Sequence, residues 1–273
     1  LIEHCVKSAL DEDYQLLIFK QARRHAEATA FKIASMVKRL TDINDSLKDL
    51  IEVLKRESPS RSEVESLTQV LSYGIAYHHA GLSLTARRVI EYGFRNRLIK
   101  VIVATPTLAA GINLPARRVL IYTRRFEGGY MKPISVAEYK QMAGRAGRPQ
   151  YDPFGEAIVA DPQSASEGRK YIQGKPEKVT SALLNQRALR IHVLATISSG
   201  YAKSIDELDK FFSKTLAYNT PKYIMSRYGV RRIIDILKDM DMIKEVNGEY
   251  VPTELGDCLL YTSDAADELD GVD

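Results

Sequence analysis

The chain has 273 residues, of which 45% are hydrophobic and 27% charged, and a formal net charge of +4, values that fit a soluble globular protein of two domains. No apolar run approaches the ~20 residues that a membrane span needs, which excludes a membrane-spanning protein. Cys5 and Cys258 have no neighbouring cysteine, so neither a zinc site nor a disulfide framework is indicated, and a cytoplasmic location is expected. The last ten residues, 264–273, hold five acids and no base, so the preceding body is more basic than the total indicates and favours a polyanionic partner.

The first part of the chain alternates short apolar runs with segments of helical spacing. The apolar runs predict buried strands over 15–19, 74–77, 100–104, 118–123 and 155–160. The predicted helices are 1–14, one from about 23, one over 64–71, one that Ser83 or Thr85 caps, a short turn ending at Gly111, and one from 136 to about 142. The polar segment 41–62, with a break at 58–60, is assigned neither helix nor strand. This order predicts an α/β domain with a parallel sheet over residues 1–165.

Ligands of parallel sheets bind at the carboxyl ends of the strands. The loops that carry Arg23, His79, Thr105 and Arg145 follow strands or are expected near that edge. Farther along, Gly128 and Gly129 lie between residues that can pair, which predicts a β-hairpin over 124–132.

The second part of the chain contains mainly helical patterns. Residues 166–180 are polar and predict a linker with one helix. Three apolar stripes follow, and Asn247-Gly248 then predicts a hairpin. Three helices followed by a hairpin is the winged-helix order, so residues 181–260 predict a winged-helix domain. The acidic tail, 261–273, has too little apolar content to pack and is expected to be disordered.

The segment 141–149 has the strongest functional signal. Arg145 and Arg148 each follow a glycine and are three residues apart, so both guanidiniums can approach one anion from the same side. Gly144 and Gly147 lack the Cβ atoms that would keep a ligand or a neighbouring backbone at a distance. The pattern predicts a phosphate clamp of the arginine-finger type. The alternative is a basic helix end that satisfies its own carbonyl groups.

Four segments together resemble helicase motifs. Residues 101–115 (VIVATPTLAAGINLP) and the pattern QxxGRxGR of 141–148 resemble motifs V and VI of superfamily-two helicases. Residues 77–82 (YHHAGL) resemble the preceding motif of the Ski2-like branch, and 19–27 resemble motif IV. The chain is most similar to the archaeal Hjm-type DNA repair helicases, over residues 1 to about 260. The resemblance implies a second RecA-like domain followed by a winged helix.

The resemblance also implies roles at the nucleotide. Arg148 would be the finger that stabilises charge on the γ-phosphate, Arg145 a second contact, and Gln141 the residue that positions the attacking water. Gly111 and Asn113 would approach ATP across the domain cleft. For Asn113, a helix cap beside a turn glycine is the alternative.

Further residues would contact DNA in such a helicase. Thr105 and Thr107 would bind phosphates of the tracking strand, with helix capping as the alternative. Arg23 and Arg24 would bind phosphates, and His79 could do so or be a packed histidine. Phe126 and Tyr130 would stack on the last base pair at the tip of a strand-separating hairpin; otherwise the hairpin covers a sheet edge. The acids in 235–241 argue against base reading by the winged helix, which would serve as a strut.

The sequence contains neither a GxxxxGK[ST] loop nor a DExH box. The resemblance therefore implies a piece of an ATP-dependent 3′→5′ helicase of forked or branched DNA that requires a first RecA-like domain and a ratchet domain from elsewhere. ATP and Mg²⁺ are expected in the intact enzyme and neither is expected to bind this chain tightly; no metal site is predicted. DNA and repair proteins are the expected partners. The alternatives are a Ski2-like RNA helicase, or a non-catalytic winged-helix module that binds DNA or a partner protein.

Overall fold

The computed structural model describes residues 1–38, 45–111, 114–147, 152, 154–219 and 227–260. The chain divides into two compact units, Leu1–Glu177 and Lys178–Asp273. The division lies inside the segment 166–180 that the sequence indicates as a linker. The acidic tail 261–273 lies outside the described residues.

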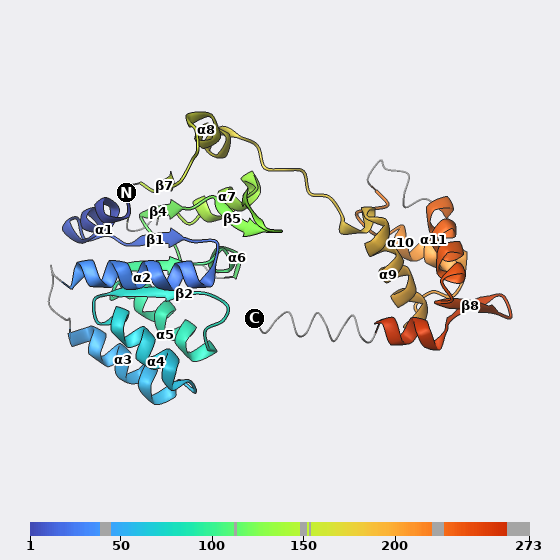
Figure 1. Cartoon of the computed structure of the whole chain (residues 1–273), viewed down its shortest axis with the longest axis horizontal. Helices are drawn as coiled ribbons and strands as arrows, with labels where there is room; N and C mark the ends of the chain where they lie inside the picture. Colours follow the sequence, from blue (N-terminus) through green and yellow to red (C-terminus); the bar gives the residue numbers. More distant parts are fainter. Residues whose placement is uncertain (39–44, 112–113, 148–151, 153, 220–226, 261–273) are drawn as a thin grey trace. The chain divides into compact units, whose positions relative to one another are not determined.

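A parallel sheet forms the centre of the first unit, with the strand order β2-β3-β1-β4-β7 (Figure 1). The strands are β1 (Leu16–Phe19), β2 (Ile75–His78), β3 (Val101–Ala104), β4 (Arg118–Ile121) and β7 (Glu156–Val159). Every residue of β1, β2 and β3 is buried. Strands that are covered on both faces can be apolar throughout, which is why these segments are unbroken apolar runs in the sequence. The predicted α/β fold is confirmed.

Eight helices of the described chain surround this sheet. They are α1 (Ile2–Asp11), α2 (Arg23–Val37), α3 (Asp45–Glu57), α4 (Arg61–Leu71), α5 (Leu84–Arg95), α6 (Thr107–Gly111), α7 (Val136–Ala143) and α8 (Ala165–Gln173). Helix α2 packs on β2 and β3, whereas α7 packs on β4 and β7. Helices α3, α4 and α5 lie together beyond the β2 edge of the sheet (Figure 1). Ser83 caps α5 with its side chain, as predicted.

Helix α3 lies in a segment that the sequence analysis assigned no element, so that assignment was wrong. Its buried residues are Leu47, Leu50, Ile51 and Leu54. Their spacing of three and four residues is that of one helical face. The remaining positions are mostly Lys, Asp and Glu, which lower the average hydrophobicity and obscure the stripe.

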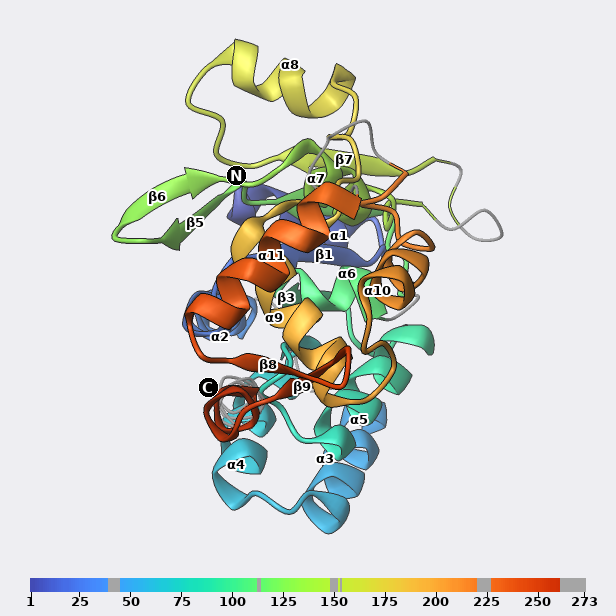
Figure 2. The ribbon, with the colours of Figure 1, turned by 90° about the vertical axis from the view of Figure 1, so that its right-hand side faces the viewer.

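The predicted hairpin between β4 and α7 is confirmed. It consists of β5 (Arg124–Glu127) and β6 (Tyr130–Pro133), which pair antiparallel. Gly128 and Gly129 have φ values of 63° and 90°. A two-residue turn with positive φ at both positions matches the twist of the strands and favours glycine. The hairpin projects away from the five-stranded sheet (Figure 2).

The second unit contains the helices and the hairpin in the predicted order. Its elements are a 3₁₀ turn (Ala182–Leu184), α9 (Gln186–Ser198), α10 (Ile205–Phe212), α11 (Arg227–Asp239), β8 (Ile243–Val246) and β9 (Glu249–Pro252), followed by helical residues 254–260. Asn247 and Gly248 form the turn with φ values of 53° and 81°. Two apolar residues of this unit, Phe211 and Met240, are 41% and 45% exposed. Phe211 lies about 100° around α10 from the buried Phe212, and Met240 follows the end of α11.

Among the described residues, no helix combines the length and the apolar character that crossing a bilayer requires. The same residues contain no group of three His, Cys, Asp or Glu side chains arranged to hold a metal ion.

Candidate nucleotide and nucleic-acid interface

The glycine-arginine segment is held against the segment that follows β3. The Arg145 guanidinium donates a hydrogen bond from Nη2 to the carbonyl oxygen of Ala109 in α6. The backbones also pair: the amide of Ala116 donates to Arg145 O at 2.9 Å, and the amide of Gly147 donates to Ala116 O at 2.7 Å. The segments that resemble motifs V and VI are therefore joined by both main-chain and side-chain bonds.

These bonds place Arg145 differently from the sequence analysis. Ala116 immediately precedes the segment that enters β4, and Ala146 forms an isolated parallel bridge with it. The backbone of Arg145 thus lies near the amino end of β4, and the expectation of the carboxyl edge was wrong for this residue. The topology explains the difference: β4 and β7 are parallel, so α7 must return the chain to the end at which both strands begin. Gln141 is exposed on this returning helix.

At one of the two glycines of the segment, a neighbouring backbone comes so close that a larger residue would not fit. Gly147 has a φ of 90°, and a Cβ on it would lie 3.2 Å from the Cα of Gly155. A Cβ on Gly155 would lie 2.5 Å from the amide nitrogen of Gly147. The neighbouring backbone therefore explains Gly147. Gly144 has an ordinary helical φ of −64°, and a Cβ there would meet only Lys140 O and Gln141 O, at 3.3 Å and 3.5 Å.

Several expected nucleotide contacts cannot be compared with the structure. Arg148 and Asn113 lie outside the described residues. Gly111 is the last residue of α6, two residues beyond the carbonyl that Arg145 binds.

The carboxyl end of β3 carries the two threonines. Thr105 is buried and its hydroxyl lies 2.9 Å from that of Thr107, which is exposed. The amide of Thr105 donates to His78 O, and the amide of Leu108 donates to Thr105 O. Thr105 therefore begins the turn of α6, and Thr107 presents the accessible hydroxyl of the pair.

The carboxyl ends of β1 and β2 bring Arg23 and His79 together. A Cβ on Gly81 would lie 3.1 Å from Arg23 Nη1 and 3.3 Å from His79 Nδ1, so both side chains border Gly81. His79 is 4% exposed, and its Nε2 lies 2.8 Å from Glu27 Oε1. Burial lowers the pKa of His79, although Glu27 acts in the opposite direction. His79 is thus a packed, mainly neutral residue at neutral pH.

Arg23 and Arg24 are the accessible cations of this edge. Arg23 is half-buried and Arg24 exposed. In the part of the chain that the structure describes, neither guanidinium pairs with a carboxylate. Both are therefore available to an anion from outside the protein.

The hairpin presents two different faces. Phe126 pairs with Met131, and Glu127 pairs with Tyr130, so Phe126 and Tyr130 lie on opposite faces. Phe126 and Tyr130 are 70% and 60% exposed. The Tyr130 ring has Lys132 Nζ 4.9 Å from its centre, whereas Phe126 and Met131 together form an apolar face. The two aromatic residues that the sequence groups as one stacking tip are therefore not equivalent.

Comparison with known proteins shows what the chain is similar to. Residues 32–150, which include β2, β3, β4 and the arginine segment, match the helicase conserved C-terminal domain. All of the matched residues belong to the first unit. The chain is also similar to curated archaeal proteins named ATP-dependent DNA helicase Hel308. The identities are 42% over 262 residues for Caldivirga maquilingensis, 37% over 269 residues for Methanocella arvoryzae and 39% over 252 residues for Pyrobaculum calidifontis.

These alignments cover 89–93% of this chain but 34–36% of the relatives. The chain therefore spans about a third of the length of the curated helicases that it resembles. The resemblance to Ski2-like superfamily-two DNA helicases that the motifs indicate is confirmed.

The first unit contains a further link that the sequence does not predict. Lys20 Nζ lies 3.0 Å above the centre of the Tyr122 ring, and Gln21 Nε2 donates to Tyr122 O at 2.7 Å. Burial lowers the pKa of Lys20 to about 8. These contacts connect the loop after β1 with the residue that follows β4. The only signal in the sequence is the basic composition of 20–25, which does not reveal the partner.

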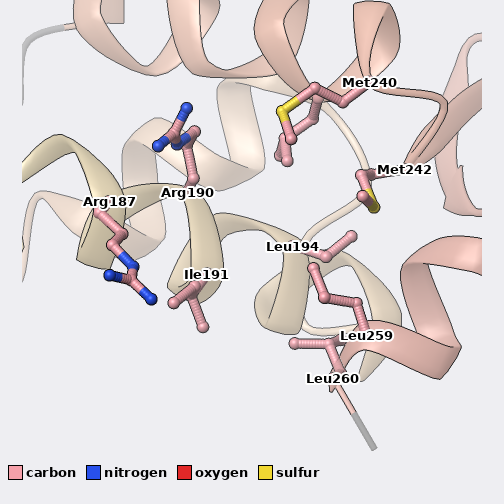
Figure 3. A pocket seen from close by; sticks show the side chains of 9 residues that line it. Arg187, Arg190, Ile191, Leu194, Met240, Met242, Leu259 and Leu260 are labelled. Atoms are coloured by element: carbon pink, nitrogen blue, oxygen red, sulfur yellow. The ribbon is translucent and has the colours of Figure 1, made fainter. Parts of the chain in front are cut away.

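The second unit contains an apolar cavity of about 290 Å³ (Figure 3). Its lining residues are Arg187, Arg190, Ile191, Leu194, Leu237, Met240, Met242, Leu259 and Leu260. The two arginines lie together on α9, and the methionines and leucines come from α9, α11 and the segments that follow (Figure 3). Apart from the two guanidinium groups, the described side chains that line it are apolar.

Proposed function

We propose that this chain supplies the second RecA-like lobe and the following winged-helix unit of an ATP-dependent 3′→5′ DNA helicase that unwinds forked or branched DNA. The observation that carries the proposal is the bonding of the segment around Arg145 to the segment 109–116, inside a helicase C-terminal domain. Because the two motif segments are fixed to each other, a nucleotide that contacts one of them also orients the other.

ATP and Mg²⁺ are the cofactors proposed for the intact protein. The printed sequence has no phosphate-binding loop and no DExH acid, so a first RecA-like lobe must supply the groups that hold the β- and γ-phosphates and the metal. Arg148 and Arg145 would add positive charge where the transferred phosphoryl group develops negative charge, and Gln141 would orient water. Gly111 and Asn113 would border the nucleotide.

DNA is the proposed polymer substrate, and the carboxyl edge of the sheet is its proposed track. Arg23 and Arg24 would bind phosphates as unpaired cations, Thr107 would donate its exposed hydroxyl, and Thr105 would fix Thr107 in place. The buried His79 would support Arg23 by packing. Phosphate contacts of this kind position a strand without reading its sequence. A ratchet domain and repair proteins are further proposed partners.

The test uses the intact protein, in which this chain is joined to its first lobe. Arg148→Ala should remove fork unwinding and DNA-stimulated ATP hydrolysis, because an arginine finger contributes ~10³–10⁵ in rate, while single-stranded DNA binding stays near the unsubstituted level. Arg61→Ala is the matched control, since Arg61 is exposed on α4 and its ion pair among the described residues is with Glu65 on the same helix. Equal loss of binding and hydrolysis in Arg148→Ala would indicate a structural role instead. Comparing the unwinding rates of DNA forks and RNA forks determines which polymer is the substrate.

A further inference from the structure

The direction of the β5–β6 hairpin is determined at its base. The chain enters the hairpin after Thr123 and leaves it at Ile134, and the amide of Ile134 donates to Thr123 O at 2.8 Å. Beyond this bond the tip residues are exposed, and the hairpin projects from the sheet (Figure 2). A two-stranded ribbon attached through two residues can rotate about its base, so contacts of the first hairpin residues with their neighbours set its angle.

One such contact joins the hairpin to helix α7. Arg125 Nη1 lies 2.6 Å from Glu138 Oε1, in the first turn of α7. The other oxygen of Glu138 accepts hydrogen bonds from the amide and hydroxyl of Ser135, at 2.8 Å and 2.9 Å. Glu138 is therefore already oriented by the capping box when it receives Arg125. Arg125 also contacts Glu127 within the hairpin, at 3.1 Å.

A second contact supports the hairpin from a different helix. Arg124 Nη2 lies 2.7 Å from Glu167 in α8, and both side chains are less than 20% exposed. Arg124 and Arg125 point to opposite faces of β5 because side chains alternate along a strand. The hairpin base is therefore braced against α8 on one face and α7 on the other.

We propose that Arg125 and Glu138 are positioning residues that make the hairpin move with α7. Helix α7 carries Gln141 and leads directly to Arg145 and Arg148, so a shift of this helix during ATP hydrolysis is delivered to the hairpin through the Arg125–Glu138 pair. The inference rests on the proposed helicase function. The pair is half-exposed, and such ion pairs add little to folding stability. We expect the pair instead to fix the angle between the β5–β6 hairpin and α7.

The experiment measures unwinding and ATP hydrolysis separately in the intact protein. Arg125→Gln removes the charge, and Glu138→Gln weakens the pair while it retains an amide oxygen that can serve in the capping box. Each variant should unwind forks about tenfold more slowly, in line with the cost of a misplaced functional group, while DNA-stimulated ATP hydrolysis stays near the unsubstituted level. The double variant should equal either single variant, since both remove the same contact. Arg125→Lys should recover most unwinding.

Lys132→Gln is the matched control. Lys132 is the cross-strand partner of Arg125, lies on the same face and also pairs with Glu127, but among the described residues its ion pair stays within the hairpin. It should unwind at the unsubstituted rate. Normal unwinding by Arg125→Gln and Glu138→Gln, equal loss in Lys132→Gln, or additive losses in the double variant would overturn the inference. Absence of DNA-stimulated hydrolysis in the unsubstituted protein would contradict the proposed function itself.

Discussion

Arg145 donates a side-chain hydrogen bond to the carbonyl oxygen of Ala109, in the middle of the short helix α6. The bond connects the segment after α7 with α6, and the main-chain bonds of Ala116 reinforce it. Arg145 therefore has a structural task in addition to the phosphate contact proposed for it. Its two tasks can be separated experimentally.

Arg145→Ala should lower both the stability and the activity of the protein. The substitution leaves Ala109 O without this donor, which costs about 1–3 kcal/mol and should reduce the melting temperature of the chain by several degrees. In the intact helicase, ATP hydrolysis should fall as well. Circular dichroism melting of the chain measures the first effect. An unchanged melting temperature would show that Arg145 acts only on the nucleotide.

Gly155→Ala should destabilise the first unit far more than Gly144→Ala. The new Cβ at 155 would lie 2.5 Å from Gly147 N and from the carbonyl carbon of Ala146, and backbone atoms at this distance must shift. Overpacking of this kind costs about 1–3 kcal/mol. Gly144 is exposed and has a helical φ, so its replacement by Ala should be neutral or slightly stabilising. Urea unfolding of both variants provides the comparison.

Phe126→Ala should impair unwinding more than Tyr130→Ala. Stacking of an aromatic ring on a base contributes about 1–3 kcal/mol, and Phe126 lies on the apolar face with Met131. Tyr130 lies on the face occupied by Lys132 and Glu127. Blunt-junction unwinding by the intact protein measures the difference. Equal unwinding rates for both variants and the unsubstituted protein would contradict base stacking by the hairpin. They would favour the alternative, in which the hairpin covers a sheet edge.

The stability of the first unit should fall as the pH drops from 7 to 5, because of His78. Burial, assisted by Arg87 and His79, lowers the pKa of His78 to about 4 from an ordinary value of 6.5. Below pH 6.5 the unfolded chain binds a proton that the folded chain does not, so protonation favours unfolding. The loss over this interval is about 2 kcal/mol.

His78→Gln removes this titration and is the informative comparison. Urea unfolding at pH 7 and pH 5 should show a smaller pH effect in His78→Gln than in the unsubstituted chain. His79→Gln should reduce it less, because Glu27 opposes the effect of burial on the pKa of His79. If the free energy of unfolding depends on pH identically in all three proteins, groups other than His78 and His79 are responsible for the loss of stability.

The sequence predicts the sheet well because three of its strands, β1, β2 and β3, are fully buried. Continuous runs such as 101–104 have few alternatives to a central parallel strand. Turns with glycine at positive φ, such as Gly128-Gly129, are also local signals. Helix α3 was missed because its apolar stripe is narrow among many charges. Local composition therefore predicts those elements whose apolar residues are not interspersed with many charged ones.

The site is less predictable because its contacts join distant residues. Arg145 and Ala109 are 36 positions apart, and His79 and Glu27 are 52 apart. Side-chain spacing gives no indication of such partners. The edge at which Arg145 lies depends on the direction in which α7 returns the chain, and this follows from the strand order. The predicted parallel sheet already implies that the helix between its last two strands returns the chain to their amino ends, so the edge at which Arg145 lies could have been deduced from the sequence.

Glu177, the last residue of the first unit, holds the start of α7: its carboxylate accepts the amides of Val136 and Ala137, each at 2.9 Å. The next residue already belongs to the second unit. The last residue before the second unit therefore caps the helix that leads to Arg145. A recombinant first unit trimmed at the end of α8 would lose these two hydrogen bonds.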